Sequence, residues 1–472
     1  MTLTYTLDVD WDGDGTLDGV NEATRMYKFT VDRGRDRTIG SPGSGFEKPN
    51  VGKMIIELDN HDGRYDPWNS GGALYGNIRP GRKCLLSFEQ SGSTDSYPLF
   101  TGFISDIRPY GYKERANLIA EDGAGWLNSR YPNIALMPAT DVGGAIDAIL
   151  TDLSYPYSTN IDKGIETIPY YWTTGANALS EIHKLANSDL GRFCVEADGT
   201  ARFRNRHSSE SVENTITEDL IGKNIYIPMP WDYSRSIVDI YIYPRIVGSS
   251  DSTLWTLRDE FTVSAGNTQE IWCQYTYENQ VVPADDVYIS SWQPTTAFAT
   301  TDIDLTAFSQ DAKVNITNTT AGAETLTELI IKGTPIYSPD KSKITASSTD
   351  LNIPAVFVFD YPWLANVNTA TSYASLLLNY LSDTKVYPEI WIYNRPDIIR
   401  TIDIEQRLRL VLDTFDIDQT FFVNKISFES GASAQELITK IKLHPMLQDV
   451  DDDVFILDSV TNGILDTNKL GF

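Results

Sequence analysis

The chain has 472 residues, of which 41% are hydrophobic and 11% aromatic, a composition that excludes an intrinsically disordered protein. At roughly 100–200 residues per domain, this length predicts about three or four domains. The formal net charge of −27 excludes a protein that grips nucleic acid or anionic lipid through a basic surface.

The first element in chain order is an acidic loop, DVDWDGDGTLD at residues 8–18. Four of its aspartates stand at positions 1, 3, 5 and 9 of a calcium-loop pattern, and Gly15 stands at position 6, where the loop must turn sharply. Ca²⁺ prefers six to eight oxygen ligands, which such carboxylates supply together with a backbone carbonyl near Thr16. The predicted ligands of a structural Ca²⁺ ion are therefore Asp10, Asp12, Asp14, Thr16 and Asp18.

The loop differs from an EF-hand. Position 12 is Asn21, Glu22 comes one residue too late, and no helix is predicted on either side. Repulsion among four close carboxylates still favours a bound cation. The alternative interpretation is a surface loop held by Asx turns, in which the aspartates bond to their own backbone.

Residues 1–128 predict a barrel-like β domain. Short apolar or alternating runs separated by Gly and Pro are typical of such a domain, and they lie at residues 54–58, 84–88, 99–104 and 116–120.

Residues 129–225 predict a small α+β domain. Apolar residues recur with a helical period at 144–153 and again from Ala178 to Ala186, and Gly191 suits the end of the second helix. The stretch 191–206 alternates on both sides of Asp198-Gly199, which is typical of a β-hairpin.

Residues 226–250 and 351–447 predict a second barrel-like β domain. It contains one helix, at 368–382, and strands at 237–243, 389–393, 407–412, 421–428 and 437–443. The Thr-rich segment 251–350, with alternating runs at 312–317 and 326–332, predicts an all-β insert domain. Residues 448–472 combine an acidic run with an apolar end, and we expect this C-terminal tail to dock on a neighbouring chain.

The predicted fold class is therefore mostly β with minor α+β. The chain is expected to be multidomain, with two barrel-like β domains, a small helix-hairpin domain and a β insert.

Catalytic patterns are scarce, and the chain is predicted not to be an enzyme. The three cysteines, Cys84, Cys194 and Cys273, are far apart and form no C-x-x-C pair, which argues against a disulfide framework or a zinc site. There is no G-x-S-x-G, P-loop, H-E-x-x-H or G-x-G-x-x-G pattern after a strand. With neither a signal peptide nor an apolar run long enough to span a membrane, we expect folding in a reducing cytoplasm.

One block carries a family resemblance. The run LDNHDGRYDPWN at 58–69 resembles the L-x-N-x-D-G-R-Y-S/D-P-x-N signature of tail-tip, or baseplate hub, proteins of long-tailed siphophage-type bacteriophages. The match continues at 74–76, 79–82 and 97–102, and the acidic loop at 10–15 is similar to one found near the start of the same proteins. The resemblance is specific in the first 105 residues and weaker across 251–350.

The resemblance implies a structural role in a virion. Two barrel-like domains per chain would place six in a ring in a homotrimer, which would adapt a sixfold tail tube to a threefold tip. The implied partners are the distal tail protein ring, the C-terminus of the tape-measure protein and a distal fibre or spike protein. The implied location is the distal tail tip, assembled in the bacterial host cytoplasm, with DNA passing through the lumen without sequence-specific binding. Within the block, Arg64 is expected to pair with Asp59 or Asp66 and so lock the turn.

Two other functions stay open. One is a calcium-dependent carbohydrate-binding adhesin, or receptor-binding tail protein, in which the acidic loop and the aromatic-rich insert contact a receptor. Tryptophans such as Trp231, Trp255, Trp272, Trp292 and Trp391 could stack on sugars, although such residues are more often strand core or interface anchors. The other is a tail-associated cell-wall hydrolase, for which nothing singles out a catalytic pair of carboxylates.

Overall fold

The computed structural model describes residues 3–36, 48–90, 95–208, 212–221, 224–229, 234–294, 302–349, 355–430, 436–445, 454–455 and 469–470. The predicted fold class is confirmed, because the chain is mostly β and multidomain. Trp231 and most of the expected docking tail at 448–472 lie outside the described residues; within the tail, β32 (Val454–Phe455) pairs with β33 (Lys469–Leu470).

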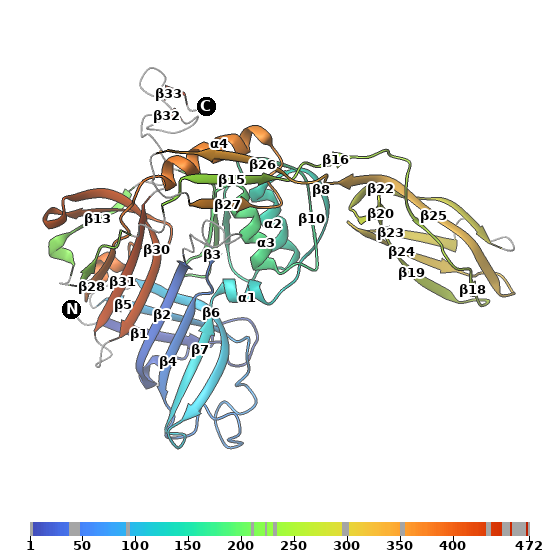
Figure 1. Ribbon diagram of the computed structural model, residues 1–472. Helices are drawn as coiled ribbons and strands as arrows, with labels where there is room; N and C mark the ends of the chain where they lie inside the picture. Colours follow the sequence, from blue (N-terminus) through green and yellow to red (C-terminus); the bar gives the residue numbers. More distant parts are fainter. Residues whose placement is uncertain are drawn as a thin grey trace.

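The first part of the chain forms an N-terminal lobe of antiparallel strands (Figure 1). Its strands are β1 (Leu3–Val9), β2 (Met26–Asp36), β3 (Lys48–Pro49), β4 (Lys53–Asp59), β5 (Lys83–Gln90), β6 (Ser96–Tyr110) and β7 (Arg115–Glu121). Alternation decides which face is buried: in β4, Met54, Ile56 and Leu58 are fully buried. The 3₁₀ helix η1 (Glu22–Arg25) leads into β2.

Late segments form a C-terminal lobe that continues the same sheet. Its elements are β13 (Val212–Thr217), η2 (Glu218–Leu220), β14 (Ile225–Tyr226), β28 (Glu389–Tyr393), α5 (Pro396–Ile399), β29 (Arg407–Leu412), η5 (Asp413–Phe415), β30 (Ile417–Ser430) and β31 (Leu437–Pro445). Among the described residues, thirteen strands join in this sheet, and one hydrophobic core spans both lobes.

The two lobes meet where β2 pairs antiparallel with β30, from Thr30 opposite Glu429 to Gly34 opposite Lys425. Gly34 has φ +129°, and a Cβ there would lie 2.3 Å from the backbone oxygen of Asn424. Only glycine therefore allows the two backbones to approach this closely.

Between β7 and β13 lies a helix-hairpin unit with its own core. It comprises α1 (Gly123–Asn128), β8 (Asn133–Asp141), α2 (Val142–Asp152), β9 (Thr159–Ile161), β10 (Thr167–Thr174), α3 (Ala178–Ser188), β11 (Arg192–Val195) and β12 (Ala201–Arg204). The side chains of Asp141 and Asn177 cap α2 and α3 by accepting a bond from a backbone N–H. Both predicted helices and the hairpin around Asp198-Gly199 are present.

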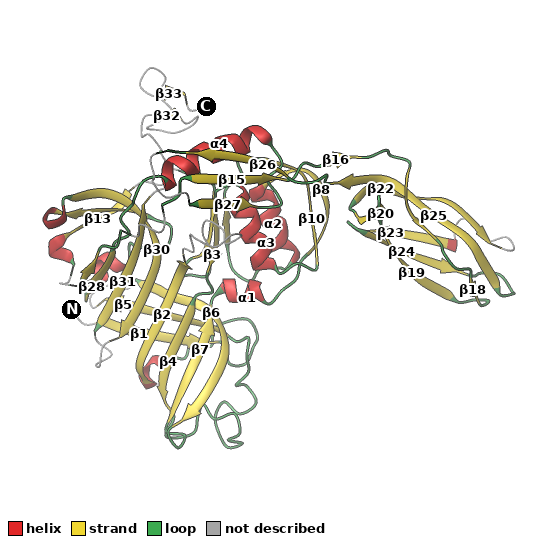
Figure 2. Ribbon diagram, in the orientation of Figure 1, coloured by secondary structure: helices red, strands yellow, loops and turns green. Residues whose placement is uncertain are grey.

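A third core lies between one helix and a three-stranded sheet. The sheet contains β15 (Ile237–Ile242), β26 (Ser342–Ser347) and β27 (Val356–Asp360), and α4 (Val367–Leu381) covers it. Figure 2 shows α2, α3 and α4 gathered in the middle of the molecule. Within the described residues, no helix is both long and apolar enough to cross a membrane.

The insert forms an arm that extends away from the rest of the chain (Figure 1). One sheet contains β16 (Ile246–Val247), β17 (Ser252–Thr256), β18 (Phe261–Val263), β22 (Ala284–Pro294) and β25 (Glu324–Tyr337). The other contains β19 (Thr268–Gln274), β24 (Asp311–Thr317) and β23 (Ile303–Ala307), next to the hairpin of β20 (Thr276–Tyr277) and β21 (Gln280–Val281). These strands enclose a fourth core.

The boundaries expected at 128, 225, 250, 350 and 447 stay predictions, because cores and shared strands do not by themselves define units that fold independently. The shared sheet adds a feature that periodicity could not give: the two regions predicted as separate barrel-like domains are joined edge to edge.

Candidate functional site

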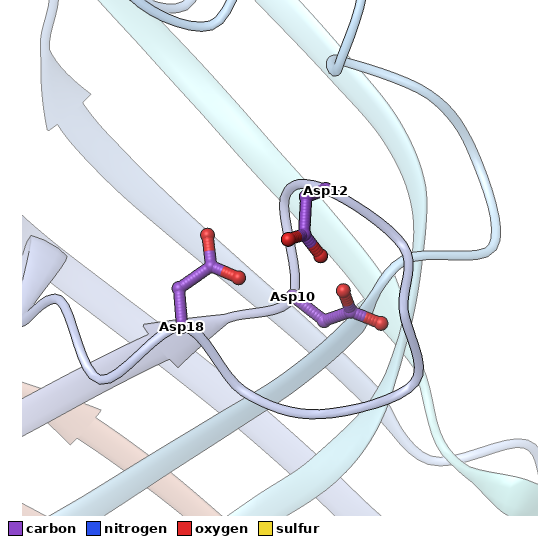
Figure 3. Close-up of side chains that lie close together, drawn as sticks. All are labelled: Asp10, Asp12 and Asp18. Carbon is purple, nitrogen blue, oxygen red and sulfur yellow. The ribbon is translucent and has the colours of Figure 1, made fainter.

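Three of the predicted calcium ligands converge in the loop after β1. One carboxylate oxygen each from Asp10, Asp12 and Asp18 lies within 4.8 Å of the others, and Figure 3 shows the three side chains around the loop. Asp10 is buried, whereas Asp12 and Asp18 are exposed. The Asp10 carboxylate accepts hydrogen bonds from the backbone N–H of Gly13 (2.7 Å) and Gly15 (3.1 Å), which curls the loop around it. The three carboxylates form an oxygen-only donor set that suits a hard cation.

The other two predicted ligands are not brought into this cluster by their side chains. Asp14 Oδ1 accepts hydrogen bonds from the Thr16 backbone N–H (2.8 Å) and hydroxyl (2.6 Å). These bonds hold the pKa of Asp14 below its ordinary value. Asx turns, the alternative interpretation of the whole loop, hold Asp14 and also Asp12, whose Oδ1 accepts from the backbone N–H of Asp14 at 3.1 Å. Asp10 and Asp18 accept from backbone N–H groups as well, so both interpretations stay open, and the backbone carbonyl expected near Thr16 stays a prediction.

Two basic residues of the strand β5 region brace the loop from outside. Lys83 Nζ donates to the Gly15 carbonyl at 2.9 Å. The Arg82 guanidinium lies so close to Gly13 that a Cβ there would be 1.2 Å from its Nη1 atom, and Gly13 also has φ +78°. The backbone conformation therefore favours glycine at position 13, whereas the Arg82 side chain is flexible and could move to make room for a Cβ.

Glu22, which comes one residue late for a calcium ligand, has a different role. Its side chain is 3% exposed, and its Oε1 accepts hydrogen bonds from Trp11 Nε1 (3.1 Å) and Arg64 Nη2 (2.5 Å). Its Oε2 accepts from the Tyr65 hydroxyl (2.5 Å) and from Arg64 Nε (3.3 Å). Both oxygens are occupied by protein donors, so Glu22 is an anchor that ties the acidic loop to the 58–69 block. We call Glu22, Trp11, Arg64 and Tyr65 the Glu22 cluster.

The pairing expected for Arg64 is wrong. Asp59 instead accepts from the His61 backbone and ring, which raises the pKa of His61 through a hydrogen bond and charge. Asp66 pairs with Lys113 Nζ at 2.5 Å. Arg64 turns inward because Glu22 is a buried carboxylate whose charge must be compensated. No local pattern in the sequence pairs Glu22 with Arg64, which lies 42 residues later.

The turn itself is held by Asn60, which is fully buried. Its Oδ1 accepts from the Tyr65 backbone N–H at 2.7 Å, and its Nδ2 donates to the Lys113 carbonyl at 2.8 Å. The block is thus fixed to the β6–β7 turn by side-chain bonds to the backbone, as expected for a cluster of turn residues.

Exposed aromatic rings occur in the block and in the segments near it. Trp68 is 76% exposed and Tyr75 is 56% exposed, and Tyr112 of the β6–β7 turn is fully exposed. The Asp66–Lys113 ion pair links the segments that carry Trp68 and Tyr112. Exposed aromatic rings of this kind are typical of contact surfaces.

The three cysteines are free and buried. Burial raises the pKa of Cys84 and of Cys273 to about 12, so that both thiols stay protonated near neutral pH. A protonated, buried thiol is a poor nucleophile and a poor metal ligand.

No family model and no curated protein matches the chain. Solved structures do resemble it. The 43 kDa tail protein of prophage MuSo2 from Shewanella oneidensis superposes with a TM-score of 0.52 at 9% identity, covering 94% of this chain and 99% of that one. The tail protein from Neisseria meningitidis MC58 gives a TM-score of 0.52 at 11% identity, covering 94% of this chain and 96% of that one. The chain therefore has the fold of these two tail proteins over nearly its whole length.

Proposed function

We propose that this chain is a structural hub at the distal tip of a siphophage-type tail, which closes the tail tube and adapts its sixfold symmetry to a threefold tip. The observation that carries the proposal is the likeness of fold to two tail proteins, which covers nearly all of each chain. The 58–69 block and its continuations at 74–76, 79–82 and 97–102 support it from the sequence.

The two lobes support the threefold part of the proposal. The strands of both lobes surround a common core, and among the described residues their pairs are antiparallel except for the parallel pair of β13 and β29. Three copies would therefore supply six lobes. In this role the chain forms a homotrimer that contacts the distal tail ring, the C-terminus of the tape-measure protein and a distal fibre or spike. The exposed side chains of Trp68 and Tyr112, on segments that the Asp66–Lys113 ion pair links, are suited to the contact with the distal tail ring. The trimer is assembled in the host cytoplasm and works at the tail tip of the virion. DNA passes through its lumen.

The first prediction concerns the assembly. The purified full-length chain is expected to have three times the mass of one chain in light scattering, and electron micrographs should show a threefold ring with six lobes. A dilution series of the same sample is the control for non-specific association. A mass of one chain at every concentration would contradict the hub proposal.

We propose a non-catalytic role. This rests on the protonated, buried Cys84 and Cys273 and on the absence of catalytic patterns from the sequence. A tail-associated hydrolase is the alternative, and a lysis band in a cell-wall zymogram would favour it.

We further propose that Asp10, Asp12 and Asp18 hold a structural Ca²⁺ ion, which would supply charge neutralisation to the loop. In calorimetric titration of the full chain, Asp10→Asn and Asp12→Asn are each expected to weaken Ca²⁺ binding about tenfold or more, because each removes a charged ligand.

Asp14→Asn is the matched control for the calcium titration. It also removes one carboxylate from the loop, but Asp14 bonds to Thr16 rather than joining the cluster. Its isotherm should stay close to that of the wild type. An equal loss of Ca²⁺ affinity in all three variants would point to general electrostatic attraction. No heat of Ca²⁺ binding in the wild type would refute the site.

A further inference from the structure

The insert exposes one tryptophan on an otherwise polar sheet face. Trp272 lies in the middle of β19, and its side chain is 56% exposed, whereas its neighbour Cys273 faces the core and is fully buried. Strand alternation thus places Trp272 on the outer face of the β19–β24–β23 sheet.

The ring is held in place before any ligand arrives. Trp272 Nε1 donates to Glu270 Oε1 at 2.9 Å, and Phe308 stacks against the ring with centroids 5.5 Å apart and an interplanar angle of 22°. Glu270 Oε2 pairs in turn with Lys313 Nζ at 2.6 Å. These contacts reduce the conformational entropy that binding would otherwise cost.

The neighbours on the same face are hydrogen-bonding groups. In the strand register, Trp272 lies opposite Lys313, which lies opposite Thr306 of β23. Two residues away, Glu270 lies opposite Asn315, which lies opposite Asp304. One fixed aromatic ring therefore shares its sheet face with two separate carboxylates (Glu270 and Asp304), the ammonium of Lys313, the amide of Asn315 and the hydroxyl of Thr306.

This arrangement is complementary to a pyranose. The C–H face of such a sugar packs on an indole ring, while its hydroxyls exchange hydrogen bonds with carboxylate and amide groups at the ring's edge. The core of a protein–protein contact would instead require an apolar patch larger than the stacked pair of Trp272 and Phe308, and the strand register around that pair is polar.

The position in the molecule fits this use. The insert is an arm that extends from the rest of the chain, and β19 and β24 lie along one side of it (Figure 1). The acidic loop belongs to the N-terminal lobe, and the insert has a separate core. We propose that the Trp272 face of the insert binds a pyranose-containing cell-surface saccharide, and that it does so without calcium.

The test uses the full-length chain, fluorescently labelled, on an array of immobilised neutral, amino and acidic pyranose oligosaccharides. The wild type is expected to bind at least one class. Trp272→Ala should lower the apparent affinity about tenfold or more, because it removes the ring on which the sugar would pack. Trp272→Phe should retain part of the binding, and chelation with EDTA should leave the wild-type signal unchanged.

Phe415→Ala is the matched control, because it removes a similarly exposed aromatic ring (50%, against 56% for Trp272) from the C-terminal lobe. It should bind the array like the wild type. No saccharide signal from the wild type overturns the proposal, and so does binding that Trp272→Ala leaves intact. Loss of the trimer in Trp272→Ala, without any saccharide signal in the wild type, assigns the ring to a contact between copies. Array binding does not depend on the oligomeric state, so this proposal and the hub proposal fail separately.

Discussion

Replacing Glu405 by alanine is expected to lower the free energy of unfolding by about 3–5 kcal/mol. Glu405 is 2% exposed and lies between two arginines: Arg35 Nη2 is 3.0 Å from its Oε1, and Arg192 Nε is 2.7 Å from its Oε2. Arg35 is 3% exposed and Arg192 is 11% exposed. Without the carboxylate, two largely desolvated guanidinium groups lose their compensating charge.

The effect should reach beyond one lobe, because the three residues come from three parts of the fold. Arg35 belongs to β2, Arg192 to β11 of the helix-hairpin unit, and Glu405 to the segment before β29. A second ion pair, between Arg33 of β2 and Asp403, is 2.9 Å long. Asp403 also accepts a hydrogen bond from the backbone N–H of Ala197, so it contacts both β2 and the hairpin of the helix-hairpin unit. Glu405 thus holds the junction of both lobes and the helix-hairpin unit.

The measurement is hydrogen–deuterium exchange of β2 and β11 together with denaturant unfolding, because a chain with several cores is not expected to unfold in one step. Asp418→Ala is the control: its partner Arg409 is 2.7 Å away, but both side chains are half exposed, and little change is expected. Glu405 has φ +71°, and alanine at this position must adopt the same backbone conformation. The comparison of Glu405→Ala with the wild type therefore reports on the loss of the side chain. Protection in β11 equal to that of the wild type would contradict the role assigned to Glu405.

Replacing Glu22 by alanine is expected to cost about 3 kcal/mol or more. The substitution removes the acceptor of Trp11 Nε1 and of the Tyr65 hydroxyl, both in buried residues, and leaves Arg64 without its counter-ion. A buried donor that loses its partner costs the desolvation of that group. The Glu22 cluster joins the loop after β1 to the block after β4, so the loss should appear as a lower thermal stability of the N-terminal lobe.

Asp62→Ala is the matched control in the same lobe. Asp62 pairs with Arg25 at 2.8 Å, but the two side chains are 52% and 33% exposed, so the expected cost is less than about 1 kcal/mol. Thermal unfolding followed by tryptophan fluorescence compares the two variants directly. Similar melting temperatures for both would show that the Glu22 cluster is not a stabilising centre.

Local patterns were sufficient for part of the fold: they predicted several strands and helices, but not β2, β8, β10 or β13. The strands at 389–393 and 407–412 and the helix at 368–382 were predicted within a residue of their observed bounds, because alternation and helical periodicity are properties of adjacent residues. The pairing of β2 with β30 could not be predicted in the same way. A buried face tells which side of a strand is covered, but not which distant strand lies at its edge.

The candidate site shows the same division. The spacing of the aspartates predicted a converging set, and three of the four do converge. The fourth, Asp14, is drawn away by the Thr16 hydroxyl, a competition between side chains that spacing does not reveal. The partner of Arg64 was mistaken because Glu22 lies 42 residues earlier, and only the tertiary structure brings them together.

The pairing of β2 with β30 also has a consequence for synthesis on the ribosome. Phe29 of β2 donates its backbone N–H to the hydroxyl of Ser430, which is 401 residues later in the chain. At 5–20 residues per second, the β30 edge of β2 waits about 20–80 s for its partner after it emerges. A nascent chain therefore carries an open strand edge for most of its translation, and this edge is where chaperone protection would matter most.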